Sequence, residues 1–129
     1  VDTGTFRLLK AHTPGPYTFI LNATREVPRL LLHPKKRTIG LRVPEHPIAL
    51  ALLAELGEPL MSVSLIMPGD TEPLEDPYEM RQLLEKQVDL IIDGGFGGGK
   101  ASTVINLADG DPEVIRVGCG DPAPFMVEA

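Results

Sequence analysis

The sequence predicts an α/β protein with a mixed β-sheet. Three observations predict this class: short β-branched and apolar runs recur along the chain, two helix patterns with clear ends interrupt them, and a turn sequence joins the last two runs. The order after the first residues is strand, strand, helix, strand, helix, strand, strand, strand, and such an order is typical of α/β domains. With 129 residues and 43% apolar content, the chain is long enough for one domain with its own core.

The predicted strands share short length, apolar or β-branched content and flanking turn residues. They are YTFIL (17–21), RTIGLRVP (37–44), PLMSVSLIM (59–67, expected to be central), VDLIID (88–93), STVINL (102–107) and EVIRVG (113–118). ADGDP (108–112) predicts a hairpin between the last two.

Two helices are predicted from their end signals. The first, 46–57, has Pro47 in its first turn and Gly57 just past its end, and its few polar positions predict that it is largely buried. The second begins after Asp76, which caps PYEMRQLLEKQ with Glu79 at capping-box spacing. A further segment, FRLLKAHT, resembles the middle of a helix close to Val1, so we expect a fragment or a processed chain.

Composition limits the function classes. The net charge of −6 argues against nonspecific nucleic-acid binding by the whole surface, although it allows a local basic patch. No apolar run reaches the ~18 residues of a membrane span, and the single Cys119 suits a reducing cytoplasm. We interpret Cys119 as a small structural residue, and His46 as a capping or packing residue, because no second His or Cys lies at metal-ligand spacing. No metal site is predicted.

The glycine-rich stretch DGGFGGGKAST (93–103) is one residue short of a phosphate-binding loop. Ala101 stands where a magnesium-binding hydroxyl belongs, and the residues after Lys100 predict a strand rather than a helix. Without that helix, its N-terminal amides and dipole are missing. We therefore reject this motif; the glycines fit an adaptable connection or cover, with Lys100 a weak phosphate candidate.

Several stretches together resemble the YrdC/YciO family, which includes the threonylcarbamoyl-adenylate synthases. They are collinear with that family over nearly the whole chain: TPGPYTFIL (13–21), IGLRVPEHPIALALLAELGEPLMSVS (39–64) and VDLIIDGG…STVINL…VIRVG (88–118). At the position of the synthases' Ser-Ala-Asn motif, the chain has SVSL (62–65), and this stretch resembles the YciO branch of the family.

The resemblance implies a twisted, open, largely parallel mixed sheet with helices, in which residues 1–129 are the C-terminal portion of a single YrdC-like domain. It implies a cytoplasmic nucleotidyltransferase that joins ATP (with Mg²⁺), L-threonine and bicarbonate into threonylcarbamoyl-AMP for tRNA modification. No motif here matches the family's upstream Lys-x-Arg element, and Ile66 replaces an asparagine amide by an aliphatic group that cannot donate to phosphate. Whether this chain is itself an enzyme stays open.

The resemblance also implies nucleotide- or substrate-binding residues that orient and neutralise phosphate rather than act as nucleophiles. They are Thr18, Arg42, Ser64, Ser102, Thr103 and Arg116. Arginine suits the role because its guanidinium donates two parallel hydrogen bonds. Adjacent strand residues face opposite sides, so Ser102 is preferred over Thr103. Ser62 would share a face with Ser64 on a strand. The hypothesis requires Arg42 and Arg116 to lie on one face of the sheet.

Two other functions stay open. One is a double-stranded RNA or tRNA binding module without catalysis, for which the basic run Lys35-Lys36-Arg37 would be a small anchor. The other, again by resemblance, is carbamoyl transfer in hydrogenase maturation, where a related domain is part of a much longer chain.

Overall fold

The computed structural model describes residues 3–29, 32–95 and 101–126. The chain forms two compact units: residues 1–61 with 102–129, and residues 62–101. Among the described helices, none is long and apolar enough to cross a membrane.

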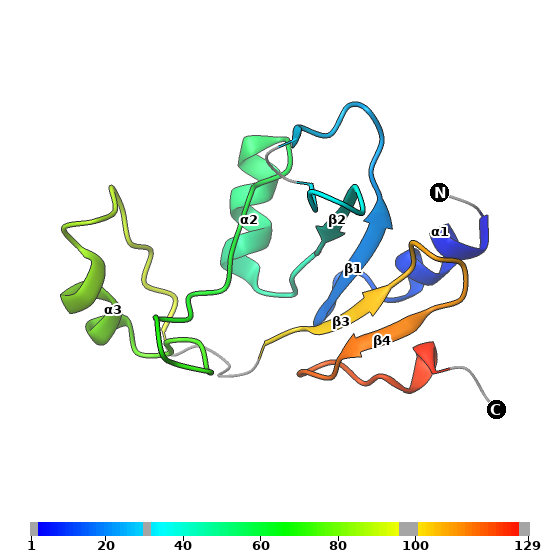
Figure 1. Cartoon of the computed structure of the whole chain (residues 1–129). Helices are drawn as coiled ribbons and strands as arrows, with labels where there is room; N and C mark the ends of the chain where they lie inside the picture. The colour runs from blue at the N-terminus through cyan, green and yellow to red at the C-terminus, as the bar shows by residue number, and fades with distance from the viewer. Residues whose placement is uncertain (1–2, 30–31, 96–100, 127–129) are drawn as a thin grey trace. The chain divides into compact units, whose positions relative to one another are not determined.

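The first unit contains a four-stranded sheet in the order β2-β1-β3-β4 (Figure 1). The strands are β1 (Tyr17–Asn22), β2 (Thr38–Leu41), β3 (Thr103–Asn106) and β4 (Glu113–Arg116). β1 pairs with β3 in parallel, and the β1–β2 and β3–β4 pairs are antiparallel. The predicted open, mixed α/β sheet and its last hairpin are confirmed. Its parallel part is smaller than expected, since only one of these three pairings is parallel.

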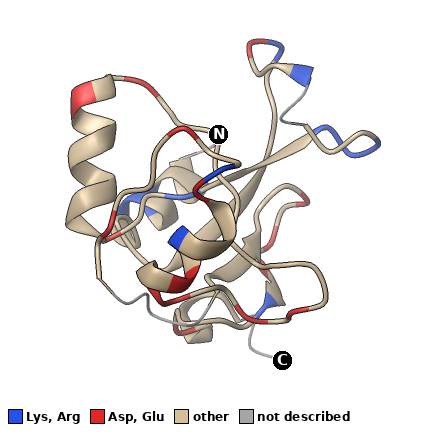
Figure 2. Cartoon of the chain, turned by 90° about the vertical axis from the view of Figure 1, so that its left-hand side faces the viewer, with Lys and Arg blue, Asp and Glu red and all other residues tan. Residues whose placement is uncertain are grey.

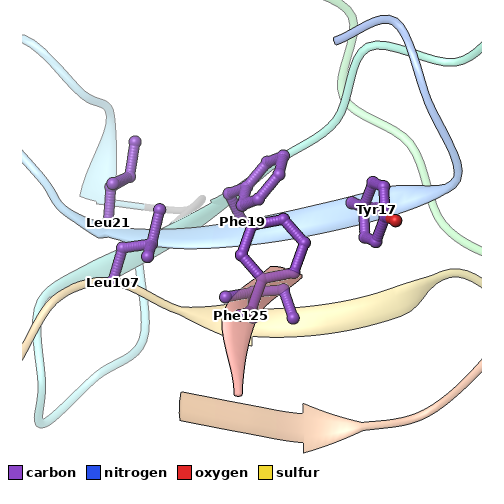
Figure 3. Close-up of a cluster of buried hydrophobic side chains, with 6 residues drawn as sticks. Tyr17, Phe19, Leu21, Leu107 and Phe125 are labelled. Carbon is purple, nitrogen blue, oxygen red and sulfur yellow. The ribbon is translucent and has the colours of Figure 1, made fainter. Parts of the chain in front are cut away.

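The core of this unit lies on one face of the sheet. Alternate residues of β1 and β3 are buried, as a sheet covered mainly on one face requires. Figure 3 shows these side chains gathered around an aromatic ring from the C-terminal segment. The buried hydrophobic residues are Tyr17, Phe19, Leu21, Ile105, Leu107 and Phe125.

Two short helical segments cover this core. The expected helix near the start is confirmed as α1 (Thr3–Ala11), from which Leu8 and Leu9 pack against the cluster. The 3-10 helix η2 (Ala123–Phe125) brings in Phe125, whose ring centroid lies 5.1 Å from that of Tyr17 and 5.7 Å from that of Phe19. Tilted and edge-on ring pairs at such distances add to the stabilisation that burial provides.

The predicted helix over 46–57 is confirmed as α2 (Pro47–Leu56), and so are its ends. His46 caps it by accepting a hydrogen bond from the backbone N–H of Ile48, and Gly57 ends it with φ 72°. The predicted burial is wrong, because no residue of α2 is buried and Leu52 is 42% exposed. Apolar composition predicts that a helix packs against other residues. It does not identify which residues those are.

The second unit contains α3 (Pro77–Leu84). The predicted cap is confirmed, since Asp76 Oδ1 accepts a hydrogen bond of 2.9 Å from the backbone N–H of Tyr78. The predicted strands over 59–67 and 88–93 are wrong, because neither segment is a strand and Val63 is 92% exposed. An apolar run becomes a strand only where a neighbouring strand completes its hydrogen bonds.

The glycine-rich stretch is described only at its ends, and Lys100 lies outside the described residues. After it, residues 101 and 102 lead directly into β3. The rejection of a phosphate-binding loop is therefore confirmed, because that motif needs a helix at this point. Cys119, expected to be a small structural residue, is a free and exposed thiol.

Replacing Phe125 by alanine should destabilise the first unit strongly. Its side chain is 2% exposed and its ring contacts those of Tyr17 and Phe19, so we expect a loss of about 3–5 kcal/mol in the free energy of unfolding. Urea denaturation followed by circular dichroism measures this loss. The neighbouring Met126→Ala is the control, because Met126 is 64% exposed. Equal losses in the two variants would contradict the assignment of the core.

Tyr17 should make the stability depend on alkaline pH. Burial raises the pKa of its phenol above the ordinary 10.0, and the nearby Asp121 carboxylate acts in the same direction. The unfolded chain therefore releases this proton at a lower pH than the folded chain, and stability present below about pH 10 falls as the pH rises. Thermal unfolding between about pH 9 and 11 should show a smaller fall for Tyr17→Phe than for the unchanged protein. Equal falls would show that Tyr17 does not contribute.

Candidate functional site

A pair of hydroxyl groups lies on the sheet face opposite the core. Thr18 Oγ1 and Ser102 Oγ are 2.6 Å apart, although 84 positions separate them in the sequence. The parallel register explains this, because Thr18 pairs with Val104 and Ser102 stands two residues earlier on the same side. One hydroxyl hydrogen lies in this bond. Ser102 is buried and Thr18 is half-buried, so Thr18 is the more accessible donor of the other hydrogen to a ligand oxygen.

Arg116 completes this cluster from the neighbouring strand. Its Nε and Nη2 donate to the carbonyl oxygen of Ser102 at 3.1 and 2.9 Å, and Nη2 lies 3.4 Å from Ser102 Oγ. In the described part of the chain, Nη1 donates to no group, so its two N–H donors can meet an anion. We call Thr18, Ser102 and Arg116 the hydroxyl–arginine cluster.

A register shift at the β3–β4 pair decides where Arg116 points. Ile105 pairs with Val114, but Val104 pairs with Arg116, so Ile115 is an extra residue in β4. Such a β-bulge redirects the side chains that follow it. The sequence around Ile115 carries no composition signal of this bulge.

Strand alternation assigns Arg42 to the sheet face of Arg116. It directly follows β2, in which Leu41 pairs with Phe19, and continuing the strand alternation by one residue puts Arg42 on the face of Thr18. Arg42 is exposed and makes no hydrogen bond or ion pair within the described ranges. β2 and β4 are the two edges of the sheet, about 14 Å apart at about 4.8 Å per strand. On this assignment, one guanidinium group lies on each side of the hydroxyl pair.

Of the other two predicted site residues, Thr103 does not join the cluster. Thr103 is fully buried on the core face, as the alternation between it and Ser102 requires. Ser64 belongs to the second unit, where it is exposed and outside any strand, so the expected strand alternation that would align it with Ser62 is absent.

Within the described ranges, no group of three His, Cys, Asp or Glu side chains could hold a metal ion. A shallow hollow of about 530 Å³ lies in the second unit, and its rim includes Asp70, Glu72, Glu75, Asp76 and Glu79. This acidic rim repels phosphate, so the hydroxyl–arginine cluster is the better anion site.

A mixed α/β sheet that presents hydroxyl and guanidinium groups on its open face is a framework for binding anions. Similarity to known proteins identifies the family of this chain. The family model described as Sua5_yciO_yrdC, Telomere recombination, matches residues 1–118. The chain therefore belongs to the Sua5/YciO/YrdC family.

Individual relatives agree with this assignment. The chain is 57% identical to the YciO protein of Escherichia coli K12 over 126 residues, which is 98% of this chain and 61% of that protein. The crystal structure of E. coli YciO superposes with a TM-score of 0.92 over the same shares of the two chains. The threonylcarbamoyl-AMP synthase of Bacillus subtilis is 33% identical over 86% of this chain and 32% of that protein.

A solved complex gives a ligand for a more distant relative. The structure of P. abyssi Sua5 complexed with L-threonine matches with a TM-score of 0.79 and 30% identity, over 92% of this chain and 34% of that one. The present chain thus spans about 61% of the length of E. coli YciO and a smaller share of the B. subtilis synthase and of P. abyssi Sua5.

Proposed function

We propose that the protein takes part in threonylcarbamoyl-adenylate chemistry as a YciO-like relative of the synthases, with ATP carried as its Mg²⁺ complex, L-threonine and bicarbonate as substrates, and tRNA modification as the destination. The observation that carries this proposal is the hydroxyl–arginine cluster. Its 2.6 Å hydroxyl pair lies on the sheet face opposite the core, and Nη1 of Arg116 donates to no group among the described residues. The match to threonylcarbamoyl-AMP synthases supports the choice of reaction.

The reaction requires neutralisation of the phosphate charge of ATP, and it does not require a nucleophile from the protein. The amine of threonine and bicarbonate give a carbamate with loss of water. A carbamate oxygen then attacks the α-phosphorus, the bond from that phosphorus to the bridging oxygen breaks, and pyrophosphate leaves. Arg116 and Arg42 offset phosphate charge from the two sides of the cluster, and the free hydroxyl hydrogen of Thr18 or Ser102 donates to a phosphate oxygen. Such preorganised donors are the main catalytic contribution in phosphoryl chemistry.

ATP binding should depend on the cluster. Arg116→Ala removes a charge-assisted donor and Ser102→Ala removes a hydroxyl, so we expect affinity to fall by about 10–100-fold and about 5–10-fold, respectively. Isothermal titration of ATP with Mg²⁺ into the full-length protein measures both changes. Lys10→Ala is the control, because Lys10 is exposed in α1.

Three outcomes decide this proposal. Affinity lost in both cluster variants and kept in the control supports it. Binding that is unchanged in Arg116→Ala, or absent in the unchanged protein, contradicts it. Adenylate formation from L-threonine, bicarbonate and ATP then tests the chemistry itself, by release of pyrophosphate.

A second candidate function is RNA binding, and the charge distribution favours it. Six of the chain's twelve Lys and Arg residues lie between positions 25 and 42, together with one acidic residue, Glu26. All six are exposed, and none forms a salt bridge within the described residues. Figure 2 shows Lys and Arg positions in blue along the bends that connect β1 to β2. The six cations are Arg25, Arg29, Lys35, Lys36, Arg37 and Arg42.

The turn that carries the basic run is shaped by His33. Its Nδ1 accepts hydrogen bonds from the backbone N–H groups of Lys35 and Lys36 at 3.2 and 3.1 Å, and its carbonyl oxygen accepts one of 3.0 Å from Arg37. Arg37 ends the turn with φ 51°. A preformed turn needs less ordering when it meets a phosphate backbone.

RNA affinity, if this surface binds RNA, should depend on salt through these cations. Replacing Lys35 and Lys36 by glutamine and Arg37 by asparagine, which tolerates positive φ, should lower the slope of log K against log salt by about 2–3. Fluorescence anisotropy with a labelled RNA duplex measures the slope. The matched control changes Arg7, Lys10 and Lys86 to glutamine. A slope that falls equally in both variants, or no binding at low salt, would contradict this second function.

A further inference from the structure

The β-bulge in β4 is what places Arg116 in the hydroxyl–arginine cluster. Val114 pairs with Ile105, and uninterrupted pairing would set Ile115 opposite Val104 and Arg116 opposite Thr103. Paired residues in an antiparallel ladder point to the same side, so Arg116 would then lie on the core face with Thr103. The extra residue instead pairs Arg116 with Val104, on the side of Ser102.

The chain beyond the bulge is fastened by the side chain of Thr103. Its Oγ1 donates to the carbonyl oxygen of Gly120 at 2.7 Å and accepts from the backbone N–H groups of Gly118 and Gly120 at 2.9 Å each. A hydroxyl has one hydrogen to donate and two lone pairs that accept. These three bonds use all of that capacity, so Thr103 has nothing left with which to bind a nucleotide.

The same turn is also held from β1. Tyr17 donates its phenolic hydrogen to the carbonyl oxygen of Asp121 at 2.9 Å. A Cβ at Gly120 would lie 2.6 Å from a ring carbon of Tyr17, so no larger residue fits without displacing the ring. Residues 118–121 are therefore fixed against the first residues of both parallel strands, only two positions after Arg116.

We propose that Thr103 is a positioning residue: by fastening the turn at 118–120 from the core side, it keeps the bulge at Ile115 in place and so keeps the Arg116 guanidinium turned toward Ser102 on the opposite face. The claim that Thr103 orients the Arg116 side chain does not depend on any ligand. Its consequence for nucleotide binding rests on the proposed function.

Nuclear magnetic resonance of the folded protein tests whether Thr103 orients the Arg116 side chain. In the unchanged protein, Arg116 Nε–H should give a hydrogen-bonded resonance with nuclear Overhauser contacts to Ser102. In Thr103→Val, which keeps the side-chain shape but removes the hydroxyl, that resonance should move to the position of exposed arginines and lose those contacts. Leu107, which directly follows β3, should keep its amide resonance. Thr103→Ser should restore the first spectrum. An unchanged Arg116 resonance in Thr103→Val overturns the inference.

An exchange of two exposed neighbours tests the bulge even if Thr103→Val does not fold. Ile115→Arg combined with Arg116→Ile keeps the composition and charge of β4 but moves the guanidinium by one position. We expect no hydrogen-bonded arginine resonance and an ATP affinity lowered about as much as in Arg116→Ala. A retained resonance with contacts to Ser102 overturns the inference.

Measurements of ATP affinity in the Thr103 variants separate this inference from the proposed function. Thr103→Val should weaken ATP binding about as much as Arg116→Ala, and Thr103→Ser should bind within about threefold of the unchanged protein. If the unchanged protein binds no ATP, the proposed function fails, and the arginine spectra of Thr103→Val and Thr103→Ser still decide the role of Thr103. If ATP binds and Thr103→Val leaves its affinity unchanged, the positioning role is overturned.

Discussion

The parallel pairing of β1 with β3 is the constraint on which the rest of this structure depends. It joins residues about 85 positions apart in sequence, so its closure carries the entropy cost of a long loop, which the contacts between the two strands must offset. What offsets that cost is the aromatic core, because each strand contributes alternate side chains to one cluster with Phe125. The register is fixed by burial: a slip of one residue would turn Phe19 and Ile105 to the open face.

That register also builds the candidate site, because the two faces of a strand cannot be set separately. Once Thr103 lies opposite Tyr17 on the core face, Ser102 must lie on the other side, beside Thr18. The two neighbouring residues then have different tasks. Thr103 uses its hydroxyl entirely within the fold, whereas Ser102 presents its carbonyl and hydroxyl oxygens to Arg116. Packing on one face and anion chemistry on the other therefore follow from the same pairing.

The sequence predicted those parts of the fold whose signals are local. β1, the last hairpin and the ends of α2 and α3 follow from strand alternation, a turn sequence and helix caps, and each is present. The family resemblance added the residues of the cluster, and strand alternation correctly separated Ser102 from Thr103. The runs at 59–67 and 88–93 failed as strands because a strand depends on a partner, and periodicity does not reveal whether the partner is present. The bulge at Ile115 has no composition signal, since an exposed isoleucine fits regular pairing equally well.

The charge distribution links the two candidate functions and favours an anionic ligand for the first unit. The chain as a whole carries −6, yet the segment 25–42 is strongly positive and ends at Arg42 on the face of the hydroxyl–arginine cluster. At physiological salt, charges farther apart than about 8 Å are largely screened, so acidic residues beyond that distance weaken this local field only slightly. Net charge is therefore a poor guide to what this chain binds. Because Arg42 belongs both to the basic segment and to the flank of the cluster, a nucleotide in the site and an RNA phosphate on the segment would meet the same positive field. A polyanion docked along the segment would bring its phosphates toward the open face of the sheet, so the two functions are compatible on one surface.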